Sequence, residues 1–199
     1  MLTHIKNLEQ IKKIDIYTSH HTHYVIGTGA NDPQKMDPKA SRETLDHSIM
    51  YIFAVALEDA SWHHVNSYKK SRANKKSTIK IWRSIKTHED KKWTKKYHDP
   101  NPKNKSFGAK VVVTLNNNKK IIEQLDKADA HPYGLRPFVR KNYINKFLTL
   151  TKNILSKKES GRFLKTVQNL TKLKPGQLNK LNIEIKSSNL KKNNKKGIF

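Results

Sequence analysis

The sequence of 199 residues predicts an α+β fold, in which a small sheet and a long buried helix precede a stretch of helices alone. Three observations predict it. Residues 11–18 place isoleucine and threonine at alternate positions, as a strand does. Residues 49–57 are apolar throughout, as in a buried helix. Residues 109–125 hold two apolar runs around an asparagine-rich turn, as in a hairpin.

The first third of the chain is expected to run from strand to loop to helix. Residues 20–38 are rich in glycine, asparagine, aspartate and proline, which predicts a loop after the strand. A single helix is expected from Pro38 to Asp59, with Asp37 as its N-cap. In such a helix His47 and Tyr51 are four residues apart and share one face.

The middle of the chain is expected to be less regular. Ser77 could cap a short helix that carries Ile79, Trp82 and Ile85, and residues 87–106 read as a loop rich in lysine, histidine and proline. The hairpin then turns near Asn116–Lys119, where asparagine tolerates a positive φ.

The last third is expected to be helical only. Helices are predicted at 139–155, after a capping box at Ser156–Glu159, and after Gly176. We therefore expect a lid-like α/β lobe at 1–130, C-terminal helices at 131–185 and a basic tail at 186–199. Helices with no sheet beside them usually pack on another element.

Composition excludes several classes of protein. The absence of cysteine excludes disulfide frameworks, thiol nucleophiles and cysteine-based metal sites. The longest apolar run, residues 49–57, is too short to cross a membrane, and the first fifteen residues lack the apolar core of a secretory signal. A cytoplasmic protein is expected.

The charge of the chain is extreme, with 41 basic against 16 acidic residues and a net charge of +25. Most of the basic residues are lysines, and lysine, asparagine and isoleucine are what AT-rich codons encode, so base composition alone could produce this charge. Non-specific binding to polyanions is nevertheless expected. An alternative function is nucleic-acid binding by residues 69–110, where lysines are interleaved with Trp82, Trp93 and Tyr97.

Three groups of residues could carry chemistry. Asp46, His47 and Tyr51 form an acid–imidazole–phenol group that could transfer a proton or hold a carboxylate, or could be a satisfied polar cluster. The HPYGLRP loop at 131–137 could hold an anion before a helix, or could be only a connecting turn. Five histidines could bind a metal, but no carboxylate lies within the HHTH segment, so no metal is expected: His20, His21, His23, His63 and His64.

Long segments of the chain resemble the MmgE/PrpD family, in particular its 2-methylcitrate dehydratase branch. They are HHTHYVIGTGANDPQKMDPKASRETLDHSIMYIFAVAL, WHHVNSY, EDKKWTKKYHDPNPKNKSFGAKVVVTL and ADAHPYGLRPFVRKNYINKF, and the similarity extends to the final GIF. Its most specific elements are Asp46-His47 before an apolar helix and the later pattern of His131, Gly134, Pro137 and Lys146-Phe147.

The resemblance implies a cofactor-free hydro-lyase of propionate catabolism, acting in the 2-methylcitrate cycle. It would remove water from 2-methylcitrate, a small tricarboxylate, to give 2-methylaconitate. The residues of this chain that could take part are Asp46, His47 and Tyr51 for proton transfer or hydrogen bonding, and Lys39, Arg42, His131, Gly134 and Arg136 for substrate binding.

The resemblance covers only the lid and the returning helices of the family. The family's helical half, which carries its main catalytic residues, has no counterpart in these 199 residues. The expectation is therefore a C-terminal fragment that is inactive alone, with a separate helical half or a second copy as its partner. A non-functional gene remnant is the other reading of this departure.

Overall fold

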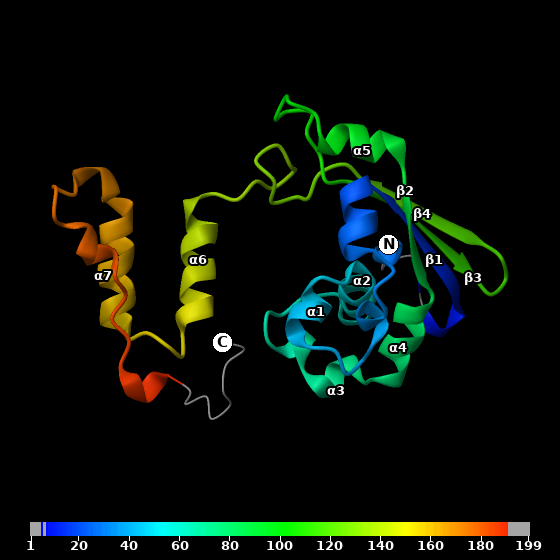
Figure 1. Ribbon diagram of the computed structural model, residues 1–199, viewed down its shortest axis with the longest axis horizontal. Helices are drawn as coiled ribbons and strands as arrows, with labels where there is room; N and C mark the ends of the chain where they lie inside the picture. The colour runs from blue at the N-terminus through cyan, green and yellow to red at the C-terminus, as the bar shows by residue number, and fades with distance from the viewer. Residues whose placement is uncertain (1–4, 6, 191–199) are drawn as a thin grey trace. The chain divides into compact units, whose positions relative to one another are not determined.

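The chain divides between Leu135 and Arg136 into two compact units. A computed structural model describes residue 5 and residues 7–190 (Figure 1). The first unit holds the sheet and most of the apolar core, and the second is built from helices. The architecture is α+β, as the sequence predicts.

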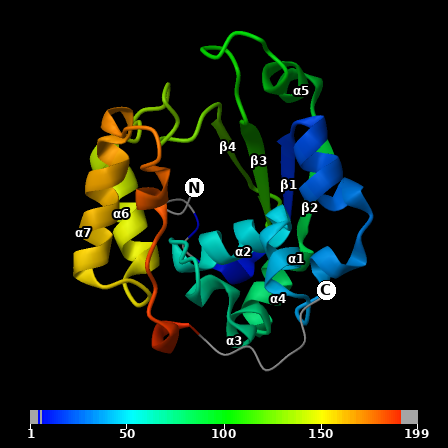
Figure 2. The ribbon, with the colours of Figure 1, turned by 60° about the vertical axis from the view of Figure 1, so that its left-hand side comes forward.

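Four strands form one mixed sheet in the order β2-β1-β3-β4, which Figure 2 shows side by side. β1 (Ile11–Thr18) and the hairpin of β3 (Ala109–Leu115) and β4 (Lys120–Leu125) confirm the predicted strands. The hairpin turn contains Asn118, whose φ is 63°. β2 (Ile85–Glu89) pairs with β1 in parallel, whereas the other two pairings are antiparallel.

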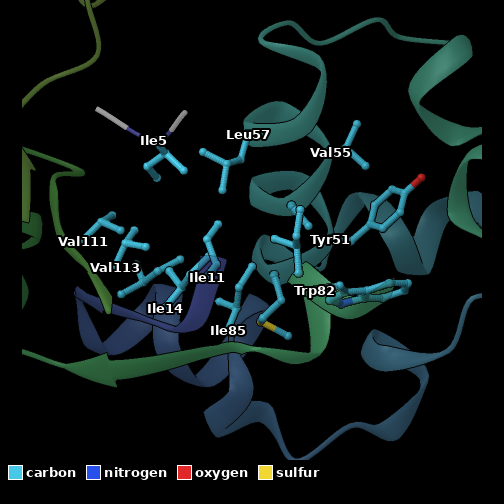
Figure 3. Packing of buried hydrophobic residues seen from close by; sticks show 14 of the residues in the cluster. Ile5, Ile11, Ile14, Tyr51, Val55, Leu57, Trp82, Ile85, Val111 and Val113 are labelled. Atoms are coloured by element: carbon cyan, nitrogen blue, oxygen red, sulfur yellow. The ribbon is translucent and has the colours of Figure 1, made fainter. Parts of the chain in front are cut away.

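The core lies between one face of this sheet and two helices, α2 (Ile49–Asp59) and α4 (Lys76–Arg83). Isoleucines and valines from β1, β2 and β3 meet apolar side chains of the helices, as Figure 3 shows for Ile14, Val113 and Leu57. Trp82 and Tyr51 are completely buried, and their rings lie 4.9 Å apart. Fully burying each large side chain contributes about 1.5–3 kcal/mol to stability.

The prediction of a single helix from Pro38 to Asp59 is wrong. The structure has a short helix α1 (Arg42–Asp46), a break at His47 and Ser48, and then α2. The break occurs because Ser48 acts as the N-cap of α2, accepting a hydrogen bond from the Tyr51 amide, while its hydroxyl donates to the Lys35 carbonyl. Ser41, and not Asp37, caps α1.

Residues 61–106 are more regular than the sequence indicates. They hold α3 (Lys70–Ala73), α4, β2 and α5 (Lys91–Tyr97). The prediction of a loop at 87–106 is wrong where the structure has the end of β2 and all of α5. Ile85, which was expected on the helix, begins β2 instead. Helical turns interrupt the loop expected at 20–38, at Thr22–Ile26, Thr28–Ala30 and Pro33–Met36. Two further turns lie at Leu8–Gln10 and Asn66–Tyr68.

The second unit contains α6 (Arg140–Thr151), α7 (Lys157–Gln168) and three short turns at Leu170–Lys172, Leu178–Leu181 and Ser187–Asn189. These confirm the predicted helices, and Ser156 caps α7 through the Glu159 amide. Among its described residues, Leu155 is the only large hydrophobic side chain that is buried. Most of the predicted basic tail, residues 191–199, lies outside the described residues.

No helix in the described part of the chain combines the length and apolar character that crossing a membrane requires.

Candidate functional site

Of the residues singled out near the start of the long helix, Arg42 and Asp46 lie on α1, a short exposed turn, and His47 directly follows it. Arg42, Asp46 and His47 are all exposed, whereas Leu45 points into the core. Ser41 at one end and Ser48 at the other satisfy backbone amides and fix where each helix begins. The sequence thus presents three polar side chains on a turn that one apolar residue anchors.

His47 is held by a hydrogen bond to its own turn. Its Nδ1 lies 2.8 Å from the Glu43 carbonyl oxygen. Because a carbonyl can only accept, Nδ1 of the neutral ring carries the proton, and Nε2 is left with a lone pair. His47 can therefore accept a proton or a hydrogen bond through Nε2 while Nδ1 holds the ring in place.

Asp46 and Arg42 are joined through Tyr68. The Tyr68 hydroxyl donates a hydrogen bond to the Asp46 carboxylate, and the Arg42 guanidinium lies 5.0 Å from the centroid of the Tyr68 ring. Burial and then the Asp46 carboxylate raise the pKa of Tyr68 well above its usual value, which keeps the phenol protonated. Tyr68 therefore orients both an anion and a cation on this turn.

Tyr51 does not belong to this surface. It is completely buried, and its hydroxyl donates a 2.5 Å hydrogen bond to the Ser67 carbonyl. The expectation that Tyr51 and His47 share one helix face is wrong, because the break at Ser48 separates the exposed turn from the buried helix. Burial raises the pKa of Tyr51, in keeping with a structural hydroxyl.

The other residues expected to bind substrate lie in two places. Lys39 is exposed just before α1, where its amide donates to the Asp37 carboxylate. The 128–135 loop is a tight turn, in which the Gly134 amide donates to the His131 carbonyl at 2.7 Å. His131 Nδ1 accepts from the Tyr133 amide, so Nε2 of its neutral ring is a donor. Arg136 belongs to the second unit.

A side chain at position 134 would overlap the carbonyl oxygens of Ala128 and Asp129, which is why this turn requires glycine. An anion before α6 would need free backbone amides at the start of this helix. One of them is occupied, because the Val139 amide donates to the Asn142 side chain. The structure thus makes the HPYGLRP segment a defined turn with one histidine donor.

These features can be compared with known families. A family model for the MmgE/PrpD C-terminal domain matches residues 1–172, from the start of the chain through the sheet unit and past α7. This chain belongs to the MmgE/PrpD family.

The segment HHTHYVIGTG follows β1 and forms a second polar cluster. The spacing of its residues in the sequence did not show that this cluster contacts β2. His23 Nδ1 lies 2.7 Å from the Thr87 hydroxyl, and the Thr28 amide donates to the same hydroxyl at 2.9 Å. A side chain at position 29 would overlap the His23 ring. Burial, and then the neighbouring His88, lower the pKa of His23, so that its ring is neutral near pH 7.

Two histidines of this MmgE/PrpD domain pair with carboxylates of β1 and β2. His88 Nε2 lies 2.9 Å from Asp15, and His20 Nδ1 lies 3.0 Å from Glu89. Among the described residues, however, no group of three or more histidines, aspartates and glutamates could hold a metal ion. The histidines singled out in the sequence make hydrogen bonds and ring contacts instead, as in His63 against His64.

Lys35 is another residue that sequence patterns did not single out. It is 9% exposed, and its ammonium lies 3.6 Å from the Asp32 carboxylate. Its carbonyl accepts from Ser48 at 2.8 Å and from the Trp82 indole at 3.1 Å. The Lys35 backbone therefore connects the segment before α1 to both core helices.

Proposed function

We propose that this chain is the lid and returning-helix part of a 2-methylcitrate dehydratase-like hydro-lyase in the cytoplasm. It acts together with a helical domain of the family type, on the same polypeptide or on a second chain. The reaction removes water from 2-methylcitrate to give 2-methylaconitate in propionate catabolism. The observation that carries the proposal is the match to the MmgE/PrpD C-terminal domain over residues 1–172. The polar turn that ends at Asp46, His47 and Ser48 supports it.

The chemistry needs groups of the kind that α1 exposes. Dehydration breaks a C–H bond and a C–O bond, so one group takes a proton and another gives a proton to the departing hydroxyl. The three carboxylates of the substrate need cations or hydrogen-bond donors. In our proposal His47 Nε2 hydrogen-bonds to the substrate, and Arg42 binds a carboxylate. Asp46 and Tyr68 position Arg42 and do not react.

We assign the remaining catalytic groups to the helical domain. The apolar faces of α6 and α7 support the need for that domain. Tyr143 and Leu148 on α6, Ile154 in the turn that follows and Val167 on α7 are between 40% and 59% exposed. Where such side chains form a contiguous patch of several hundred Å², the patch marks a site of interaction. We propose that these faces pack on the helical domain, and that the sheet unit closes over the substrate.

Citrate should bind at the α1 turn, because its carboxylates resemble those of the proposed substrate. We expect the ring protons of His47 to shift on titration with citrate in NMR spectra. Replacing Arg42 by glutamine should weaken this binding about tenfold or more, because a charge-assisted hydrogen bond contributes about 1.5–3 kcal/mol. R83Q is the matched control, since Arg83 is also exposed but lies on α4. Equal effects of R42Q and R83Q would contradict the assignment of Arg42.

The 199-residue chain alone should not convert 2-methylcitrate, and conversion should appear when a helical domain of the family is supplied. The product can be followed by the absorbance of its new conjugated double bond. In the reconstituted enzyme, H47Q should lower kcat/KM by about 100-fold or more, the range for loss of a proton-transferring or hydrogen-bonding group. Turnover by the chain alone, or full activity of the H47Q enzyme, would overturn this part of the proposal.

A further inference from the structure

A lysine-lined groove lies along α5 and is not used by the proposed reaction. It encloses about 570 Å³ between α5, the segment at 99–105 and the end of β4. Its lining combines five lysines with two aspartates and an asparagine, namely Lys92, Lys95, Lys96, Lys103, Lys127, Asp99, Asp126 and Asn104. Five lysines against two aspartates give the groove a net positive charge, and Lys96 is paired with Asp126.

The sequence of α5 explains why the lysines gather here. Asp90 caps the helix through the Lys92 amide, and Trp93 is its buried anchor, only 1% exposed. Lys92 and Lys96 lie over the Trp93 ring, at 4.8 and 5.3 Å from its centroid. Lys95 lines the groove as well, and a second hollow of about 450 Å³ shares Lys95 and Asp99 with it.

Aromatic side chains gather at the carboxyl end of α5. Phe107 is 63% exposed, and its ring lies 5.0 Å from that of Tyr97 at the end of α5. Tyr97 also stacks on His21, with centroids 5.1 Å apart. The tryptophans that the sequence suggested for stacking are not available, because Trp82 and Trp93 are buried. Any stacking on a ligand therefore falls to Phe107.

We infer that the α5 groove, defined by the lining residues above, binds single-stranded nucleic acid, and that Phe107 beyond the end of α5 takes part by stacking. Lysines act as point charges that neutralise phosphates without reading sequence. An unpaired base stacks on an exposed aromatic ring, and Phe107 offers one where it packs on Tyr97 at the end of the same helix. A small carboxylate ligand would need a more enclosed pocket with few polar groups, whereas Lys92, Lys95, Lys103 and Asn104 are all exposed. This inference does not depend on the dehydratase proposal.

The test uses the full chain and a fluorescein-labelled oligothymidine of roughly 20 nucleotides, longer than the usual single-strand site. Fluorescence anisotropy at several salt concentrations gives the dependence of log K on log salt concentration. The triple variant K92Q/K95Q/K103Q should reduce the magnitude of that slope by about 2, since each phosphate that is no longer neutralised lowers it by about 0.7. K76Q/K80Q/K86Q removes the same charge from exposed sites on α4 and β2 and should change the slope much less.

The contribution of Phe107 is tested separately. F107A should weaken binding about fivefold or more, and F107W should restore it, because every base can stack on an aromatic face. Circular dichroism of each variant confirms that it is folded. Equal slopes for the two triple variants would show that only the overall charge attracts the oligonucleotide. Unchanged binding by F107A, together with equally strong competition by inorganic polyphosphate, would show a general polyanion surface. Either result overturns the inference.

Discussion

Replacing Arg72 by methionine should lower the free energy of unfolding of the sheet unit by about 3 kcal/mol, near the lower end of the range for breaking a buried ion pair. The Arg72 side chain is 13% exposed and makes two 2.9 Å hydrogen bonds to Asp59 and a 2.8 Å ion pair to Glu58. Its removal leaves the Glu58 carboxylate buried, with Lys75 still 2.9 Å away. Urea unfolding, with exposed Arg83→Met as the matched control, measures the difference.

The same cluster should also make stability depend on pH. Burial opposes ionisation of Glu58, but hydrogen bonds from Ser77, Thr78 and Lys75 and the charge of Arg72 outweigh it and lower the pKa of Glu58 from 4.5 to about 2. A group with a depressed pKa stabilises the folded state above its unfolded pKa, and this contribution is lost as the pH falls from about 4.5 to 2. E58Q should lack this acid-dependent component. An R72M variant as stable as the parent chain would refute the buried cluster.

Replacing Trp82 by alanine should lower the free energy of unfolding by about 3–5 kcal/mol. Trp82 is completely buried, its ring packs against Tyr51, and its indole nitrogen donates to the Lys35 carbonyl. W82F keeps an aromatic ring but removes the indole N–H and part of the ring volume, so we expect a smaller cost, about 1–3 kcal/mol. Trp62, which is 38% exposed, supplies the control W62A. Equal effects of W82A and W62A in guanidinium unfolding would disprove the central position of Trp82.

The parts of the fold that the sequence predicts are those with a strong hydrophobic period. In β1 apolar residues alternate with polar ones, and the strands of the β3–β4 hairpin contain continuous apolar runs. α7 begins at a serine cap, so local patterns are enough to predict all of these elements. β2 was missed because IKTHE contains a single apolar residue, and its pairing with β1 crosses 71 positions from Ile14 to Ile85. α5 was missed because its one anchor, Trp93, stands among lysines.

The candidate site could be predicted only in part. Residue type alone points to Arg42, Asp46 and His47, whose exposure the structure shows, but the organisation of this segment depends on contacts between distant residues. Tyr68 binds Asp46 from 22 positions away, and Ser48 reaches the Lys35 carbonyl 13 positions back. The apolar period runs on through Ile49, so no local pattern shows that the helix breaks there or that Tyr51 is removed from the surface.

Because of the break between α1 and α2, residues of α1 can be substituted more freely than residues of α2. α1 contacts the core through Leu45, whereas Arg42, Asp46 and the following His47 are exposed. Substitutions at these three exposed positions therefore leave α2 packed as it is. Surface substitutions of this kind usually change stability by less than about 0.5 kcal/mol. We therefore expect a substitution at Arg42 to alter ligand binding while the serine cap and the apolar helix behind it stay the same, so that substrate preference can change at this position without rebuilding the domain.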